Sequence, residues 1–347
     1  MPPPTVAPTP ATKASRGARR LSWLVWLYAL AVIGVALLIN RLSDEWWPAT
    51  LVLFAPRWIY ALPLLLLVPA ALRWRRRLLW VLAATACVLL VPVQGFVLPS
   101  PQALAGSDRT PDLRVVTYNM GEGHFAPAEV VVWLDDIGPQ IAVFQECARL
   151  IEPVRKLLVE RGWRVEVQQG SCMVSRYPIR RVEARAQDAI WKMYGSGVMV
   201  RYEVETPRGV VNVVNLHLAT VRQGLNAILY RRWGGVSELE DNIEQRELES
   251  LLAHAFAIQS KGPLLVTGDF NMPVESAIYR RHWSDLTNAF SCAGYGFGTS
   301  KETRVHGIRI DHVLLGPGWT CLHTRVGPHL GGDHRPMIAD LAWGAEP

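Results

Sequence analysis

The sequence predicts an α/β sandwich of two packed sheets with outer helices, preceded by a membrane region of about three helices. Three observations support this fold class. Apolar segments of strand length recur from residue 113 to residue 345, with few long helices between them. Three long apolar segments fill much of the first hundred residues. The charge is also divided, because residues 1–110 carry 11 Lys and Arg against 3 Asp and Glu, whereas residues 111–347 carry 25 against 27.

The first hundred residues have the composition of a membrane region. Residues 1–20 are rich in Pro, Thr and Ala and end in arginines, which predicts a disordered basic tail. The apolar segments 21–39, 51–72 and 78–98 each approach the ~20 residues that a helix needs to cross a bilayer. Tryptophans lie at or near their ends, as in an interfacial aromatic belt: Trp23, Trp26, Trp46, Trp47, Trp58, Trp74 and Trp80. We therefore predict a multi-pass region over residues 21–98.

The loops between these segments predict the orientation. Four arginines between residues 73 and 77 separate the second segment from the third, and the N-terminal tail is also basic. Basic loops stay in the cytoplasm, so three crossings place everything after the linker of residues 99–112 on the extracytoplasmic side of the cell membrane. The second segment contains Pro56 and Arg57, and a topology with only two crossings would reverse this orientation. No small-residue cleavage site follows the first segment, which disfavours a signal peptide.

The domain of residues 113–345 alternates between strand and helix patterns. Period-two or continuous apolar runs predict strands at residues 113–118, 140–145, 163–167, 172–175, 197–205, 209–218, 264–268 and 309–315. Helical apolar spacing predicts helices at residues 126–136, 151–160 and 239–258, with a long loop over residues 219–239. A Thr-Pro-Arg turn at residues 206–208 joins two strands as a hairpin.

One stretch carries the clearest chemical signal, Leu264-Leu265-Val266-Thr267-Gly268-Asp269-Phe270-Asn271-Met272-Pro273. An apolar strand delivers a carboxylate and, two residues later, a carboxamide. Alternate residues of a strand point to the same face, so Asp269 and Asn271 project together. Asp, Asn, Gly and Pro also form turns, so this stretch alone leaves a plain turn as the alternative.

The same pattern recurs elsewhere in the domain. Polar side chains stand at or near the ends of apolar strands, or in the last loop, at Asn119, Glu146, His217, Asp311, Asp333 and His334. Isolated buried charges are costly, and a divalent ion with mutual hydrogen bonds offsets that cost. Carboxylates and carboxamides without thiolates favour Mg²⁺ or Mn²⁺ over a closed zinc site. The two histidines add acid–base capacity near neutral pH.

Other kinds of site lack their sequence motifs. The chain has no Walker loop, GxGxxG, HExxH or GxSxG, which leaves cofactor-binding and serine-hydrolase functions without support. Its five cysteines form no CxxC pair. Disulfides are permitted, but we interpret Cys147, Cys172, Cys292 and Cys321 as core thiols.

Six short segments occur in an order that is typical of one family. They are TYNM with Asn119, FQE with Glu146, NLHL with His217, GDFN with Asp269 and Asn271, RIDHVLL with Asp311, and GDHRP with Asp333 and His334. Together with SRYPI, they make residues 111–345 resemble the endonuclease/exonuclease/phosphatase superfamily. The resemblance implies a four-layered α/β sandwich and an enzyme that cleaves a phosphate ester by metal-assisted attack of water. Gly332 departs from the family, which commonly has Ser before the last Asp-His pair.

The resemblance also implies a metal site. Glu146 would bind Mg²⁺, or Mn²⁺ in its place, and Asn119 would support it. Asp333 would join this site and would orient His334, and that pair would contact the phosphate or transfer a proton. A metal and histidines neutralise the charge that develops on the phosphoryl oxygens, which is usually the largest catalytic effect.

The remaining matched residues would act on the water and the phosphate. Asp269 would orient or deprotonate the attacking water, and Asn271 would hold a phosphate oxygen. His217 would stabilise the phosphate or the leaving group, and Asp311 would complete the polar network. The choice of base and acid among Asp269, His217 and His334 stays open.

These observations predict a membrane-anchored, Mg²⁺-dependent phosphoesterase whose substrate is a phosphodiester. Duplex DNA favours a basic groove, and the slight acidic excess of this domain favours a lipid or a small phosphodiester instead. A nuclease acting on DNA or RNA is the enzymatic alternative, and an inactive binding module that keeps the fold is the alternative of another class. The lipid bilayer is the expected partner of the N-terminal region, and no protein partner is predicted.

Two groups of polar residues have a structural interpretation. His312 follows Asp311 in a strand and should therefore face the opposite side, as a structural residue. Arg222, Arg231, Arg232 and Trp233 would form a substrate lip or touch lipid headgroups, but a solvated loop is the favoured interpretation.

Overall fold

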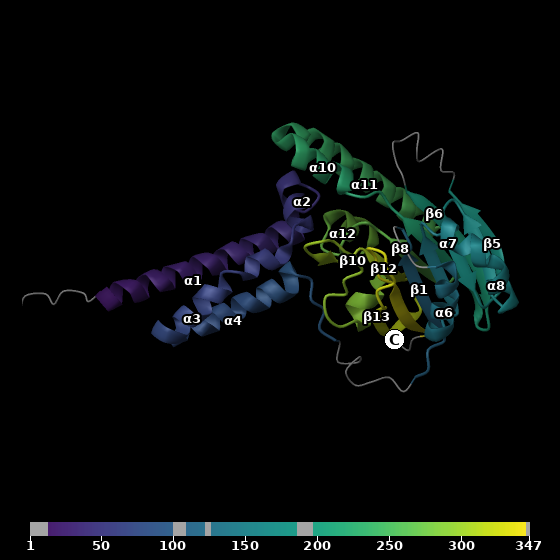
Figure 1. Cartoon of the computed structure of the whole chain (residues 1–347), viewed down its shortest axis with the longest axis horizontal. Coiled ribbons are helices and arrows are strands. Elements are labelled where there is room, and N and C mark those ends of the chain that lie inside the picture. The colour runs from purple at the N-terminus through teal and green to yellow at the C-terminus, as the bar shows by residue number, and fades with distance from the viewer. Residues whose placement is uncertain (1–12, 100–108, 122–125, 186–196, 345–347) are drawn as a thin grey trace, which may run out of the picture.

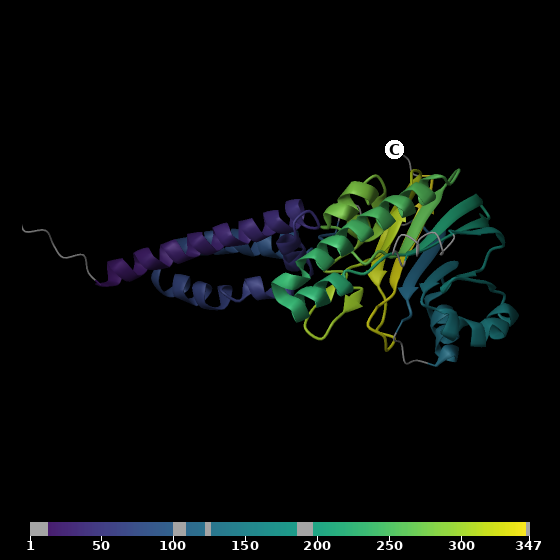
Figure 2. The same cartoon turned by 90° about the horizontal axis from the view of Figure 1, so that it is seen from above.

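The structure is a computed structural model that describes residues 13–99, 109–121, 126–185 and 197–344. Long apolar helices extend from one side of an α/β domain, as both views show (Figures 1 and 2). Part of the predicted tail, residues 1–12, and most of the predicted linker, residues 100–108, lie outside the described residues. Helix α1 already begins at Lys13, inside the predicted tail.

Three helical stretches are long and apolar enough to cross a membrane, as the sequence predicts. They span Gly17–Leu42, Arg57–Trp74 and Arg76–Val93. The main helices in them are α1 (Lys13–Leu37), α3 (Leu64–Trp74) and α4 (Leu79–Val88). Shorter helical segments continue these stretches: η1 (Leu38–Leu42), η2 (Arg57–Ala61), η3 (Arg76–Leu78) and η4 (Leu89–Val93).

The second stretch begins six residues later than the sequence suggests, because a separate helix precedes it. Helix α2 (Trp47–Phe54) ends just before Ala55 and Pro56, and the residue before a proline avoids the helical conformation. Trp47, Leu51 and Phe54 pack against the apolar core between the α/β domain's second sheet and its outer helices. The start of the predicted second crossing therefore belongs to the contact with the α/β domain.

The first sheet has six strands in the order β13-β14-β1-β2-β4-β3. Strands β1 and β2 run parallel, and the other neighbours run antiparallel. The strands are β1 (Leu113–Asn119), β2 (Ile141–Gln145), β3 (Arg164–Gln168), β4 (Ser171–Ser175), β13 (Trp319–Val326) and β14 (Met337–Trp343).

The second sheet has six strands in the order β5-β6-β7-β8-β12-β9. Strands β7 and β8 form its parallel pair. The strands are β5 (Ile179–Ala184), β6 (Val198–Thr206), β7 (Gly209–His217), β8 (Leu264–Asp269), β9 (Thr287–Asn288) and β12 (Asp311–Leu315). A small hairpin of β10 (Lys301–Glu302) and β11 (Gly307–Ile308) lies outside both sheets.

Three apolar clusters produce four layers. The first cluster lies between the sheets and includes Val115, Val143 and Val213. The second joins the second sheet to α11 (Val236–Ile258) and α12 (Ala277–Trp283). The third joins the first sheet to the outer helices α6 (Pro127–Ile137), α7 (Ala148–Ile151) and α8 (Arg155–Glu160). Two mixed, mainly antiparallel sheets flanked by helices confirm the predicted α/β sandwich.

The predicted loop over residues 219–239 is wrong. The segment folds as helix α10 (Arg222–Arg231) and the short turn η6 (Arg232–Gly235), which lead directly into α11. Leu225 and Ile228 of α10 pack against the core beneath α11. This tertiary packing stabilises a helix that contains Gly224, and a glycine inside a helix costs about 1 kcal/mol relative to alanine.

The interpretation of Cys147 and Cys172 as core thiols is also wrong. These residues form a disulfide whose Cα atoms lie 6.1 Å apart, within the normal range for such bonds. Strand β4 lies beside β2 and places Cys172 opposite Phe144, close to the residue that follows Glu146. Cys321 is a buried free thiol as expected, whereas Cys292 is exposed.

Candidate active site

The parallel strand pairs bring polar strand ends together at one edge of the sandwich. In the β7–β8 register His217 is opposite Asp269, and in the β1–β2 register Asn119 is opposite Gln145. Carboxyl ends of parallel strands meet at the same edge of a sheet. The strand ends of both sheets therefore converge on one site.

Gly268 allows the close approach that places Asp269. Its φ is +137°, and a Cβ there would lie 1.9 Å from the carbonyl oxygen of Leu216 on the neighbouring strand. Any side chain at this position would push β8 away from β7. The glycine of the GDFN motif therefore lets β8 lie close to β7, which places Asp269 next to His217.

Hydrogen bonds fix the carboxylate of Asp269. The side chain is buried, Oδ2 accepts a hydrogen bond from Asn119 Nδ2 at 3.0 Å, and Oδ1 accepts one from the backbone N–H of Asn271 at 2.8 Å. Two imidazole nitrogens also face Oδ2, namely Nε2 of His334 at 3.6 Å and Nε2 of His217 at 3.8 Å. Asp269 is therefore the centre of the cluster.

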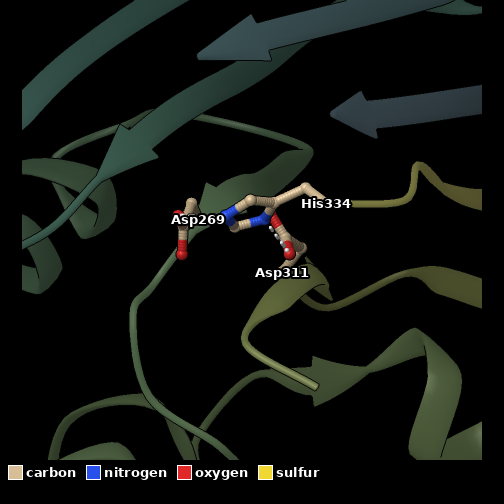
Figure 3. Close-up of side chains that lie close together, drawn as sticks. All are labelled: Asp269, Asp311 and His334. Atoms are coloured by element: carbon tan, nitrogen blue, oxygen red, sulfur yellow. Dashed lines mark hydrogen bonds and ion pairs between the residues drawn. The ribbon is translucent and has the colours of Figure 1, made fainter. Parts of the chain in front are cut away.

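Asp311 and His334 form a buried pair beside Asp269 (Figure 3). Asp311 Oδ2 lies 2.9 Å from His334 Nδ1, and Asp311 faces Asp269 across the β12–β8 register. Burial lowers the pKa of His334, but the carboxylates of Asp311 and Asp269 outweigh it and raise that pKa to about 9. The imidazole is therefore positively charged at neutral pH.

Glu146 and Asn119 form the more open side of the site. Glu146 follows β2 with a φ of +52°, which is unusual for a residue with a side chain and is found at functional sites. Its Oε1 accepts a hydrogen bond from Asn119 Nδ2 at 3.2 Å and lies 3.7 Å from His217 Nε2. Gly121 leaves room for this carboxylate, because a Cβ there would lie 2.2 Å from Glu146 Oε2.

Asn271 reaches the site at its margin. It also has a positive φ, +52°, and its Nδ2 donates a hydrogen bond to the carbonyl oxygen of Leu218 at 2.8 Å. This bond ties the loop after β8 to the end of β7. As a phosphate ligand, Asn271 stays a prediction.

The structure corrects one expected contact. Asp311 rather than Asp333 holds Nδ1 of His334, and Asp333 forms an ion pair with Lys301 of β10. Asp333 stands in a bend before β14 and approaches only the other ring nitrogen of His334, Nε2, at 4.0 Å. As a metal ligand, Asp333 stays a prediction.

His312 has the structural role that alternation predicts. It is buried, its Nε2 faces the carbonyl oxygen of Met272 at 2.9 Å, and its Nδ1 faces Asn288 Nδ2 at 3.2 Å. Burial lowers the pKa of His312 to about 4. A neutral imidazole satisfies both contacts and braces the loop that follows Asp269.

The side chains present fit a hard divalent cation. Asp269, Asp311 and His334 offer ligand atoms within 4.8 Å of one another, and within the described residues Asp311 Oδ1 is buried without a hydrogen-bond donor. With its pKa raised to about 9, the imidazole of His334 carries a proton on both nitrogens at neutral pH, so it acts as a charge partner and has no free lone pair for a metal ion. Glu146 is half-exposed beside the carboxamide of Asn119, and such oxygen donors suit Mg²⁺ or Mn²⁺.

Sequence reasoning missed a polar network directly beneath the site. Gln145 Nε2 donates hydrogen bonds to Asn215 Oδ1 at 2.6 Å and to Thr117 Oγ1 at 3.1 Å. Asn215 Nδ2 donates to the carbonyl oxygen of Phe144 and to Ser171 Oγ. This network joins the two sheets under Glu146. The signal was present, since Gln145 and Asn215 are polar residues inside the FQE and NLHL segments.

A cavity of about 160 Å³ adjoins the site. Glu146 and His217 line it together with Gly170 and Ser171. Its walls connect the disulfide-bonded turn after β2 with the end of β7.

Comparisons with known proteins give a consistent result. The model of the family described as "Endonuclease/Exonuclease/phosphatase family" matches residues 116–334. An endonuclease/exonuclease/phosphatase from Beutenbergia cavernae shares the fold with a TM-score of 0.50 and 17% identity, over 68% of this chain and 72% of that one. A 3' phosphatase, NExo, from Neisseria gives 0.51 and 19%, over 67% and 100% of the two chains. A family protein from Bacteroides thetaiotaomicron gives 0.51 and 13%, over 67% and 98%. No curated protein matches the sequence.

Proposed function

The chain belongs to the endonuclease/exonuclease/phosphatase family of metal-dependent phosphoester hydrolases, and on that premise we propose that it hydrolyses a phosphodiester at the surface of a membrane. The observation that carries the proposal is the convergence of strand ends from both sheets. Asn119 and Glu146 come from the first sheet, and His217 and Asp269 come from the second. Their carboxylates, carboxamide and imidazole surround a space where a phosphate would meet water.

Asp269 is the residue best placed to orient the attacking water or to accept its proton. Asn119 and the backbone of Asn271 hold its two oxygens in fixed directions, and a positioned base contributes roughly 10²- to 10⁴-fold to a rate. Glu146, Asn119 and Asp333 are the proposed holders of the divalent cation. When bound, this cation supplies positive charge to the phosphoryl oxygens and lowers the pKa of a bound water.

The two histidines act on the phosphate. His334 carries a proton that Asp311 stabilises, so it places a fixed positive charge beside the reacting centre. His217 lies at the open side between Glu146 and Asp269, where it stabilises the phosphate or protonates the leaving oxygen. Charge placed in advance of the reaction is usually worth more than charge recruited during it.

The contacts behind the site support a substrate at the membrane surface. Asp44, in the turn between α1 and α2, binds Arg246 of α11, whose Nη2 also reaches the carbonyl oxygen of Asn271 at 3.5 Å. Ser43 of the same turn donates a hydrogen bond to the carbonyl oxygen of Glu275 at 3.0 Å. The loop that follows Asp269 is therefore bound directly to the end of the first membrane helix. A phosphodiester in the headgroup region would be close to this loop.

The disulfide supports an extracytoplasmic site. Cys147 and Cys172 are bonded next to Glu146, and structural disulfides persist in oxidising compartments such as the periplasm or the cell exterior. This agrees with the basic tail and the arginine cluster being cytoplasmic. We therefore propose a multi-pass membrane protein with its catalytic domain on the extracytoplasmic side.

Nucleic acid is the second candidate substrate. The Neisseria phosphatase is described as bound to a product DNA hairpin, and that fold likeness is the observation in favour. Residues 111–347 carry 25 Lys and Arg against 27 Asp and Glu, whereas proteins that bind duplex DNA rely on basic surfaces. The contact with the membrane helices therefore favours a lipid phosphodiester.

A substrate panel tests the proposal. The full chain in lipid nanodiscs is given phosphatidylcholine, sphingomyelin, single-stranded DNA, duplex DNA and bis-p-nitrophenyl phosphate, each with Mg²⁺ and with chelator. We expect hydrolysis of a lipid diester that exceeds hydrolysis of DNA and that disappears in the Asp269→Asn variant. Faster cleavage of DNA than of the lipid diesters would indicate that the protein is a nuclease. Binding of a phosphodiester without any turnover would indicate an inactive binding module.

A further inference from the structure

The hairpin of α10 and α11 carries an exposed apolar tip away from the catalytic cluster. The tip consists of the last turn of α10 and η6, and its residues are Leu229, Tyr230, Arg231, Arg232 and Trp233. Leu229, Tyr230 and Trp233 are 71%, 79% and 79% exposed. Contiguous large apolar side chains on a surface indicate an interaction site.

Two glycines give the hairpin a closely packed backbone. Gly224 faces Leu239 of α11, and a Cβ there would lie 2.7 Å from a leucine methyl group. Gly235 follows the tip, and a Cβ there would lie 2.2 Å from the carbonyl oxygen of Ala227. The tip thus belongs to a closely packed pair of helices. Its apolar side chains could be buried between α10 and α11 only if the two helices moved apart.

The tip lies on the side of the domain from which the membrane helices extend. In both views the hairpin reaches back beside α2 toward the ends of the long apolar helices (Figures 1 and 2). The ring of Trp233 packs edge-on against the ring of Trp47, with centroids 5.7 Å apart. Trp47 stands at the start of α2, directly after the turn that ends the first membrane helix. The tip is therefore continuous with the membrane-proximal surface.

We propose that this tip inserts into the headgroup region of the same bilayer that the three apolar helices cross. Trp and Tyr prefer the membrane–water boundary, because they have an apolar body and a polar atom. Arg232, between Tyr230 and Trp233 in the chain, is exposed and complements anionic headgroups. The inference rests on the proposed membrane insertion of the helices. Its consequence is a second, peripheral contact that fixes the tilt of the catalytic domain and keeps its site turned toward lipid.

A depth measurement in the full chain tests the tip. The exposed thiols are first removed by Cys87→Ser and Cys292→Ser, and Leu229→Cys is then labelled with the fluorophore NBD. The protein is placed in nanodiscs of phosphatidylcholine and phosphatidylglycerol, with doxyl-labelled lipid as the quencher. The matched control is Val159→Cys, which is 50% exposed on α8 at the far side of the domain (Figure 1). Leu66→Cys, 78% exposed on α3, reports membrane insertion itself.

The three labels separate the outcomes. We expect doxyl lipid to remove about half or more of the emission at positions 229 and 66 and to leave position 159 unchanged, because only inserted groups meet the quencher. Quenching at 66 without quenching at 229 would overturn the tip contact while the anchor stands. Equal quenching at 229 and 159 would also overturn it, and absence of quenching at all three positions would overturn both the tip and the anchor. Tyr230→Cys repeats the measurement on the same turn if the first variant does not fold.

Discussion

Asp44 and Arg246 form an ion pair of 2.9 Å in which both side chains are fully buried. The carboxylate belongs to the turn after the first long apolar stretch, Gly17–Leu42, and the guanidinium belongs to α11 of the α/β domain. Asp44 also accepts a hydrogen bond from Ser276 Oγ, and the guanidinium lies over the ring of Phe54 of α2. The two parts of the chain are therefore joined by a charged contact that is closed to water.

Removal of one partner of this pair should be more harmful than removal of both. Arg246→Leu leaves the Asp44 carboxylate buried without its counterion, and a loss of about 3–5 kcal/mol in the free energy of unfolding is expected. The double variant Asp44→Leu, Arg246→Leu should recover part of that loss. Denaturant unfolding of the full chain in detergent measures both. Losses that simply add would show that the pair is not coupled.

The activity should decline above the pKa of His334. That pKa lies near 9, above the ordinary value of 6.5. The proton therefore stabilises the folded chain fully below pH 6.5, and this contribution disappears as the pH rises through 9. Asp311→Asn removes one of the carboxylates that raise the pKa, so the alkaline limb of the pH–rate profile should move toward lower pH. An unchanged alkaline limb would exclude His334 as the charged group.

Loss of the disulfide should weaken both stability and metal binding. Cys147→Ser with Cys172→Ser opens a loop with a sequence separation of 25 residues, for which about 3 kcal/mol is expected. Glu146 directly precedes Cys147, so the Mg²⁺ concentration needed for half-maximal activity should rise. Cys292→Ser is the matched control and should change neither quantity. If all variants need the same Mg²⁺ concentration for half-maximal activity, the disulfide does not help to position Glu146 for metal binding.

The buried network beneath the site should affect catalysis as well as stability. Asn215→Ala removes the hydrogen bonds of Asn215 to Gln145, to the carbonyl oxygen of Phe144 and to Ser171, at a cost of about 1–3 kcal/mol. Asn212→Ala, at the other end of β7, breaks a comparable buried hydrogen bond to Lys261 and serves as the control. Both variants should lose stability, but only the first should lower kcat. Similar kcat values for the two variants would argue against a role of the network in holding Glu146.

Much of the site could be predicted because its residues follow strands. An apolar strand ends at a defined residue, so the sequence alone places Asn119, Glu146, His217 and Asp269 at strand ends. Alternation also predicts that His312 points away from the site. This argument does not apply to Asp333, which stands in a bend rather than in a strand and pairs with Lys301. It could not identify Asp311 as the partner of His334, because that contact depends on the packing of a distant loop.

The features that the sequence did not predict depend on tertiary contacts. Helix α10 contains Gly224, which weakens a helix, and packing on α11 through Leu225 and Ile228 stabilises it. The disulfide requires β4 to return beside β2, and cysteine spacing alone does not determine such a pairing. The second long apolar stretch begins at Arg57 rather than at residue 51, because the preceding helix α2 is apolar for a different reason, its contact with the α/β domain.

The most direct test of the account is the hydrolysis of bis-p-nitrophenyl phosphate by the full chain with Mg²⁺, compared with the same chain in chelator and with the Asp269→Asn variant. This variant keeps the size of the side chain and removes the charge that orients the water. We predict a metal-dependent rate that falls by at least about 10²-fold in the variant, while the variant remains folded. A rate that is insensitive to chelator, or that is equal in the variant and the parent chain, would contradict the assignment of this site.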